Sequence, residues 1–363
     1  MGRDNGTPIL VSDAMQHQSR LKNRTLWPAW GLTLCLALQG CGLAYDALQY
    51  VMPVASHELD AICKRRQVRI GLATEPFRPF VFPAIWTDEG ARVTGLDVEL
   101  VRLIIDALSQ HCGKPVTPVL HLVRFRDLFS LLNEGQLDLF VSAVAANTPS
   151  PTRAGFAYSI PYFYNGGISG IARRPEIIER VRANLRAQAE NPAPDGLIAN
   201  ERALTGLTTA VQELTAAHLY AEANLKTSRL VLCDSLPAAF ESADASNDPV
   251  IDVILGAQPV LEFTATRVRK DWKLLTRDDG RPFFLTQAHY SVVMAEESYR
   301  LRWFVNSLLF RLDESGRLLE IRKRWTEEAY AFPRRASAEG LAFDVEKMVA
   351  HYDQGRCRVE RSR

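Results

Sequence analysis

The strongest constraint on the fold is an alternation of strand-like and helix-like segments over residues 67–145. Residues 67–73 alternate polar and apolar side chains and then run apolar, as a buried strand does. Residues 94–113 carry apolar side chains at nearly helical spacing, and Gly113 followed by Pro115 indicates a helix end. The alternation continues with a strand, a helix and a strand over residues 115–123, 125–136 and 137–145. This order predicts an α/β fold with a mostly parallel sheet flanked by helices.

Composition narrows the class of protein. The chain has 363 residues, of which 47% are apolar, so it can form about two ordinary globular domains. Lysine and arginine together number 43, against 42 acidic residues. A net charge of +1 without a clustered basic face argues against nucleic-acid binding.

The N-terminal region predicts an export signal. Residues 19–24 (SRLKNR) are basic, and residues 25–41 (TLWPAWGLTLCLALQGC) are apolar up to Gln39, too short a run to span a membrane. The end of this run resembles a bacterial lipobox, which implies lipidation of Cys41, although Gln39 is not the small residue usual there. We expect residues 1–41 to be an export or lipoprotein signal. An uncleaved apolar anchor is the alternative.

Four cysteines remain beyond this signal: Cys63, Cys112, Cys233 and Cys357. Their spacing does not suggest a zinc site. In an oxidising compartment Cys63 can bridge to Cys112 or to Cys357, and buried free thiols are the alternative.

The loop at residues 147–163 (NTPSPTRAGFAYSIPYF) follows the strand predicted at 137–145, where ligands of open parallel sheets bind. Its single charge is Arg153. Ser150 and Pro151 indicate a helix start, where a cation opposes the helix dipole. A cation placed there favours a bound anion, and the planar guanidinium fits a carboxylate. A solvated surface arginine is the alternative.

Several short motifs follow one another in a fixed order. They occupy residues 77–80, 94–100, 135–139, 150–153, 158–162 and 303–325. Together they resemble the polar amino acid-binding family of extracytoplasmic solute-binding proteins, the capture components of ABC importers. The resemblance covers about residues 66–326. It implies a two-lobed periplasmic-binding-protein fold, each lobe a mostly parallel sheet flanked by helices, joined by a two-crossing hinge.

The resemblance also implies a domain organisation. Lobe 1 would hold residues 60–165 and 293–330, and lobe 2 residues 170–288. The hinge would cross near residues 164–174 and 287–297, where Gly166, Gly167 and Gly170 suit a backbone change. We expect residues 331–363 to be a solvated C-terminal extension, with contact of its arginines with a membrane surface as the alternative.

The same resemblance assigns ligand-binding roles. Arg153 would clamp a ligand carboxylate, helped by the hydroxyl and N–H of Thr148, and the carbonyl of Ala146 would meet a ligand amine. Phe77 and Phe125 would flank the ligand side chain, with plain core packing as the alternative.

Two further residues complete the implied site. Thr215 remains from a V-Q-x-G-T-T loop in which Leu214 replaces the glycine, which puts the backbone approach to ligand in doubt. Glu75 lies near Phe77 and can meet a cationic ligand group, with a solvated loop acid as the alternative.

One departure from the family pattern concerns the ligand amine. The aspartate that grips it falls on Ala257 here. Loss of that anion would leave a ligand ammonium poorly paired, so a carboxylate without an amine is a reasonable ligand, with Gln258 as a neutral partner. A shifted register, with Asp252 or Asp248 serving instead, is the alternative.

Function follows as an expectation from the resemblance. The protein would capture a small carboxylate-bearing solute in the periplasm and pass it to the membrane permease of an ABC importer. It would use no cofactor or metal, bind no nucleic acid, and touch the membrane only through a lipid anchor or an uncleaved signal. The alternatives are a cyclohexadienyl-type dehydratase, with Glu75 or His289 as its acid or base, and a ligand-sensing accessory protein.

Overall fold

The computed structural model describes residues 57–359, apart from 76, 147, 149–152, 191–199, 227, 246–249, 329–330 and 345–355. The predicted export signal with Cys41, the predicted helix start at Ser150 and Pro151, and Asp248 therefore lie outside the described residues. Within the described ranges, no helix combines the length and apolar character needed to cross a membrane.

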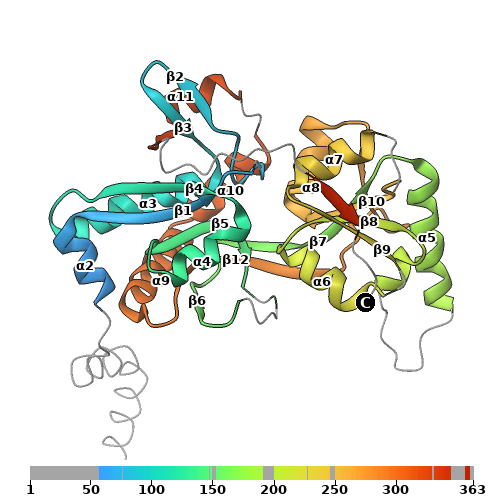
Figure 1. Ribbon diagram of the computed structural model, residues 1–363, viewed down its shortest axis with the longest axis horizontal. Helices are drawn as coiled ribbons and strands as arrows, with labels where there is room; N and C mark the ends of the chain where they lie inside the picture. Colours follow the sequence, from blue (N-terminus) through green and yellow to red (C-terminus); the bar gives the residue numbers. More distant parts are fainter. Residues whose placement is uncertain are drawn as a thin grey trace, which may run out of the picture. The chain divides into compact units, whose positions relative to one another are not determined.

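Within the described residues, eleven strands form one sheet, in the order β14-β9-β8-β10-β7-β12-β5-β1-β4, with β11 beside β7 and β6 beside β12 (Figure 1). Its strands are β1 (Gln67–Ala73), β4 (Thr117–Val123), β5 (Leu139–Ala145), β6 (Phe156–Tyr158), β7 (Phe163–Ala172), β8 (Thr208–Gln212), β9 (Arg229–Cys233), β10 (Val253–Ala257), β11 (Lys273–Leu274), β12 (Thr286–Ala295) and β14 (Cys357–Val359). A separate small sheet holds β2 (Ile85–Thr87), β3 (Gly90–Val93) and β13 (Leu341–Ala342).

Two groups of parallel strands occupy the two ends of the large sheet. At one end β1 pairs in parallel with β4 and β5, and at the other β8 pairs in parallel with β9 and β10. The prediction of parallel sheets is confirmed. We call the first group with its helices lobe 1 and the second group with its helices lobe 2.

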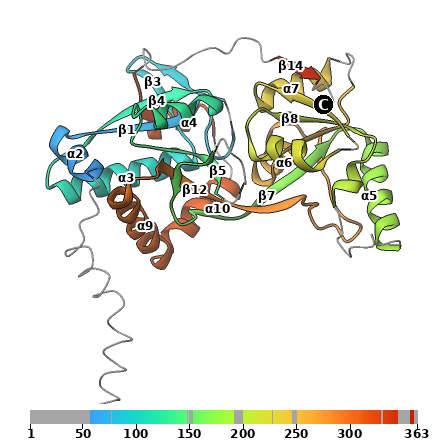
Figure 2. The ribbon, with the colours of Figure 1, turned by 60° about the horizontal axis from the view of Figure 1, so that its bottom comes forward.

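Strands β7 and β12 join the two groups (Figures 1 and 2). They pair antiparallel with each other, β12 continues beside β5 in lobe 1, and β7 continues beside β10 in lobe 2. The predicted two-crossing hinge is confirmed. A Cβ on Gly167 would lie 2.4 Å from the carbonyl oxygen of Thr286, so only glycine fits this crossing. Gly166 and Gly170 also lie in β7 without a positive φ, so these glycines serve close approach here.

The helices cover both faces of the parallel strands. They are α2 (Glu58–Arg65), α3 (Leu96–Cys112), α4 (Leu128–Asn133), α5 (Pro175–Glu190), α6 (Ala216–Asn224), α7 (Leu236–Asp244), α8 (Gln258–Phe263), α9 (Tyr299–Glu314), α10 (Arg317–Thr326) and α11 (Arg334–Glu339), with shorter turns η1 (Phe125–Asp127), η3 (Asn200–Leu204) and η4 (Thr264–Val268). The predicted helix at 94–113 is confirmed as α3, which ends where Gly113 adopts a left-handed φ of 63°.

Strand β5 shows why lobe 1 is layered. All seven of its residues are buried, as its apolar sequence predicts. Val141 packs in the same cluster as Ile104 of α3, whereas Phe140 packs in a second cluster with Leu128 of α4. Because successive side chains of a strand point to opposite faces, β5 places α3 and α4 on opposite sides of the sheet.

Two disulfides are present among the described residues. Cys63 of α2 bonds to Cys112 of α3, which confirms one of the predicted alternatives. The alternative bridge from Cys63 to Cys357 is wrong, because Cys357 lies on β14 and bonds to Cys233 of β9.

The C-terminal extension returns to the fold at two places. Its β13 pairs with β3 beside lobe 1, and its β14 adds an antiparallel strand to the edge of lobe 2. The expectation of a solvated tail is therefore wrong for these strands.

Candidate functional site

A cavity lies between lobe 1 and lobe 2 and is lined by residues of both. Strands β1, β5, β8 and β10 all point into it. Their last residues, Ala73, Ala145, Gln212 and Ala257, each line the cavity. This is the edge of the sheet where ligands of parallel α/β folds bind.

Arg153 is the cation of this cavity. It is only 6% exposed and lines the cavity wall. Its Nη1 donates to the carbonyl of Ala145 at 2.9 Å, and its Nη2 donates to the carbonyl of Leu214 at 3.5 Å. Its guanidinium carbon lies 5.4 Å from the centroid of the Phe129 ring.

No carboxylate pairs with Arg153 within the described part of the chain, and its buried Nε has no hydrogen-bond partner there. Burial lowers the pKa of Arg153 below its ordinary value, because desolvation penalises the charged form. A guanidinium carries five N–H donors, so several of them remain for an anion in the cavity.

The loop after β8 supplies the lobe 2 side of the site. Leu214, which stands where the family has glycine, adopts the left-handed φ of 58° that glycine favours. Its N–H donates to Nδ1 of His218 at 3.0 Å, which helps to hold this conformation. The replacement of glycine therefore does not prevent the backbone of Leu214 from facing Arg153.

Thr215 lines the cavity and also begins α6. Its hydroxyl donates to the carbonyl of Gln212 at 2.7 Å and accepts from the N–H of His218 at 3.4 Å. The predicted contact residue is thus in place, and its hydroxyl serves as the helix N-cap.

Phe77 and Phe125 both line the cavity. Phe125 is also buried against Phe129, with ring centroids 6.1 Å apart, and Phe77 lies 6.3 Å from Phe80. Each ring therefore faces the cavity while it belongs to a packed aromatic cluster.

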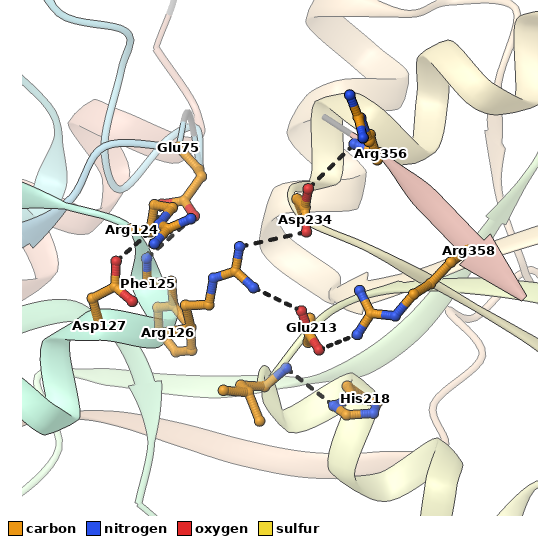
Figure 3. A network of polar contacts seen from close by, with 11 residues as sticks. Glu75, Arg124, Phe125, Arg126, Asp127, Glu213, His218, Asp234, Arg356 and Arg358 are labelled. Carbon is orange, nitrogen blue, oxygen red and sulfur yellow. Dashed lines mark hydrogen bonds and ion pairs between the residues drawn. The ribbon is translucent and has the colours of Figure 1, made fainter. Parts of the chain in front are cut away.

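Glu75 is a buried cavity residue, not the solvated acid of the alternative interpretation. Both of its carboxylate oxygens accept from the N–H of Phe125, at 3.2 and 3.0 Å (Figure 3). Burial raises the pKa of Glu75 to about 7, and these hydrogen bonds offset only part of that rise. Near neutral pH this carboxyl can therefore donate or accept a proton.

Asp97 is a second buried acid on the cavity wall. It accepts from the hydroxyl of Tyr162 at 2.8 Å and from the N–H of Ala143 at 2.9 Å. Burial raises the pKa of Asp97 to about 7. The sequence placed Asp97 in a motif at the start of α3 but gave no sign that it would face the cavity.

Thr148 and Ala146, which the sequence pattern assigns to the site, do not line the cavity. The N–H of Ala146 donates to the carbonyl of His289 at 3.3 Å, while the preceding carbonyl, that of Ala145, meets Arg153. His289, the other candidate acid or base, does not line the cavity either.

Gln258 also lies off the cavity. It donates to Glu262 at 2.8 Å and borders a separate groove. The physical reason is that Ala257 ends β10 whereas Gln258 begins α8, so the two side chains diverge. Asp252 does not replace the missing acid, because it lies before β10, accepts from the N–H of Thr208 and pairs with Arg174.

Gln212 is a cavity residue to which the sequence assigned no role. Its side chain is buried, and its Oε1 has no hydrogen-bond partner within the described residues. The available signal was the V-Q-x-G-T-T resemblance, of which Gln212 is the glutamine.

Residues 69–328 match the family model described as bacterial extracellular solute-binding proteins, family 3. The chain belongs to this family. No protein of curated function matches the sequence significantly. Within the described residues, no group of three or more histidine, cysteine or acidic side chains could hold a metal ion.

Solved structures show the same fold. A mutant of ArgBP from T. maritima is 22% identical, with a TM-score of 0.57, and covers 75% of this chain and 100% of its own. An amino acid ABC transporter substrate-binding protein from Streptococcus pneumoniae bound to L-arginine is 19% identical, with a TM-score of 0.56, covering 76% and 99%. The ancestral amino acid-binding protein AncCDT-1, described as a precursor of cyclohexadienyl dehydratase, is 18% identical, with a TM-score of 0.56, covering 75% and 100%. At these identities the likeness shows the two-lobed fold alone.

Proposed function

We propose that this protein binds a small carboxylate-bearing solute, an amino acid or an amino-acid-like organic acid, and delivers it to the permease of an ABC importer. The observation that carries the proposal is Arg153, a buried arginine on the cavity wall that no acid of the described chain neutralises. A buried charge without a partner is costly. A ligand carboxylate that enters between the lobes would supply the missing anion.

The residues around Arg153 indicate the rest of the ligand. Ala257 leaves a methyl group where the family pattern has the acid that holds an α-ammonium. Phe77 and Phe125 offer apolar rings, and Gln212 offers a carbonyl oxygen that no described residue pairs and that accepts a neutral N–H or O–H. We therefore favour a carboxylate with an apolar body and no α-ammonium.

The proposed place of action is the periplasm. The predicted signal over residues 1–41 would direct export, and lipidation of Cys41 or retention of the apolar run would tether the protein to the membrane. The two disulfides are consistent with an oxidising compartment. Metabolic labelling with a fatty-acid analogue tests the anchor, since a Cys41→Ser variant would lose the label.

Native mass spectrometry of the purified protein is the decisive experiment. We expect a co-purified acid, and the identified acid should then raise the melting temperature of the apoprotein. The variant Arg153→Ala should lose this rise, whereas Arg281→Ala, a change at an exposed arginine, should keep it. An undiminished rise in Arg153→Ala would contradict the role of Arg153.

A second candidate function is dehydration of a cyclic carboxylate. It is favoured by Glu75, a buried cavity acid whose pKa of about 7 suits general acid catalysis near neutral pH. Prephenate-like substrates test it, with Glu75→Gln as the variant that should lose turnover. No turnover at high protein concentration would remove this candidate.

A further inference from the structure

A network of charged side chains, which we call the rim contact, joins the two lobes next to the cavity residues Phe125 and Gln212 (Figure 3). Arg126 of η1, in lobe 1, reaches two acids of lobe 2. Its Nη1 lies 3.0 Å from Oε2 of Glu213, and its Nη2 lies 3.6 Å from Oδ1 of Asp234. One guanidinium therefore bridges two carboxylates across the cleft.

The C-terminal strand β14 and Arg356, the residue directly before it, hold the same two acids from their other side. The side chain of Arg358 pairs with Oε1 of Glu213, and the N–H of Arg356 donates to Oδ2 of Asp234 at 3.3 Å. Each acid thus gives one oxygen to β14 or to Arg356 directly before it, and leaves the other for Arg126 (Figure 3). The backbone N–H of Asp234 in turn donates to the carbonyl of Arg356 at 3.2 Å, so these two residues are joined by two hydrogen bonds.

Strand β14 is fixed in this position by a covalent bond. Cys357 pairs with Cys233 in the strand register and bonds to it, and Cys233 directly precedes Asp234. The family match ends at residue 328, so β14 is an addition to the family fold.

We propose that β14 is a positioning element of the ligand cleft. By holding the far oxygens of Glu213 and Asp234, it presents their near oxygens to Arg126 and so favours the closed arrangement of the lobes. This inference rests on the proposed function only for its consequence, tighter ligand capture. The closure itself is independent of what the ligand is.

The adjacent residues link the rim contact to the ligand site. Glu213 meets Arg126, and the next residue, Leu214, meets Arg153 through its carbonyl. Two arginines of lobe 1 therefore converge on consecutive residues of one lobe 2 loop. A loop that shifts when β14 is released would move both contacts together.

The expected size of the effect is moderate. The side chains of Arg126 and Arg358 are 31% and 55% exposed, and exposed pairs contribute little because solvent screens them. We expect Arg126→Ala to lower the ratio of closed to open molecules about two- to fivefold. Release of β14 should lower it by less, since Arg126 can still find acids that are no longer held in place.

The experiment measures the distance between the lobes in the full chain without added ligand. Fluorescent labels on noncanonical residues at Lys114 of lobe 1 and Lys226 of lobe 2, both exposed, report the distance by single-molecule energy transfer. Arg126→Ala, Arg358→Ala and the pair Cys233→Ser with Cys357→Ser should all increase the open population. Arg358→Lys, which keeps the charge, should restore most of the closed population.

Matched controls separate closure from general destabilisation. The pair Cys63→Ser with Cys112→Ser removes the other disulfide, and Arg281→Ala removes an exposed arginine outside the network. Both should leave the lobe distance unchanged. If Arg126→Ala opens the lobes but neither β14 variant does, the role of β14 is overturned. If Arg126→Ala has no effect, the whole rim contact is overturned.

Failure here is distinguishable from failure of the proposed function. Lobe distances that follow these expectations in a protein that binds no carboxylate would support the rim contact and reject the proposed ligand. Lobe distances that stay unchanged in the variants of a protein that binds a carboxylate through Arg153 would reject the rim contact and support the proposed ligand.

Discussion

Two arginines of lobe 1 point across the same cleft, and their surroundings differ in one decisive respect. Arg153 is 6% exposed and has no acid within ion-pair distance in the described chain. The side chain of Arg126 is 31% exposed and has two acids, Glu213 and Asp234. The buried arginine therefore has no acid to neutralise it, whereas the partly exposed arginine is paired with two acids.

The difference separates a ligand site from a closure contact. Desolvation of Arg153 costs free energy that its hydrogen bonds to the carbonyls of Ala145 and Leu214 return only in part, and such a perturbed charge is a common property of functional sites. Arg126 loses little solvation and gains a weak, reversible contact, which suits a cleft that must open. Four experiments test this contrast, beginning with the one of largest expected effect.

Arg153→Ala should abolish ligand binding, which is the larger of the two effects compared. A buried charge pair that loses one partner loses roughly 2–5 kcal/mol, so binding of the co-purified acid should become undetectable by calorimetry. The unfolding free energy without ligand should stay the same or rise, because an unpaired buried cation is removed. A clear fall in that free energy would show that Arg153 serves the fold instead.

Glu75 extends the comparison to the acids of the cleft. Its pKa in the folded protein is about 7, above the ordinary 4.5, so between these values the folded state binds more protons than the unfolded state. Glu75 should therefore lower the unfolding free energy as the pH rises from about 4.5 to about 7, by on the order of 3 kcal/mol. Glu75→Gln should reduce this dependence in urea titrations and leave the part that Asp97, whose pKa is also raised to about 7, contributes.

The control is Glu134→Gln, at an exposed acid of lobe 1. It should leave the pH dependence unchanged. Ligand binding should also weaken as Glu75 ionises, because a second carboxylate then repels the bound one. A steeper pH dependence in Glu75→Gln would contradict the assignment.

Ala257→Asp should give the cavity the acid that it lacks. If Ala257 stands where the family has the aspartate that binds the ligand's α-ammonium group, the new carboxylate should improve binding of L-arginine or L-glutamine. We expect a gain of roughly 1.5–3 kcal/mol, measured by calorimetry. Ala257→Asn has nearly the same size without the charge and should improve binding much less. Equal effects of the two variants would exclude an ammonium site at this position.

The weaker interaction, between Arg126 and Glu213, is tested by a double-mutant cycle. Arg126→Gln and Glu213→Gln, alone and together, should show a coupling of about 0.2–1 kcal/mol in ligand affinity, and the coupling should shrink in high salt. A coupling as large as that expected for Arg153 would mean that Arg126 is part of the ligand site.

Local sequence patterns determined much of this molecule. The alternation over residues 67–145 predicted β1, α3, β4, α4 and β5, because burial on one or both faces dictates the spacing of apolar side chains. Arg153 follows β5 in the sequence, and its place on the cavity wall was predicted by the rule that ligands bind at the carboxyl ends of parallel strands. These features depend on neighbours in the chain, so the chain order reveals them.

Only the tertiary structure decided the rest. The bond between Cys233 and Cys357 joins residues 124 positions apart, and no spacing rule predicts such a partner. Asp97 and Gln212 line the cavity, whereas Gln258 turns away from it. These positions depend on how the ends of four strands meet. The rim contact of Arg126 likewise needs two lobes and a returning strand. Contacts between distant segments are set by the packing of whole elements, and a linear pattern carries no record of that packing.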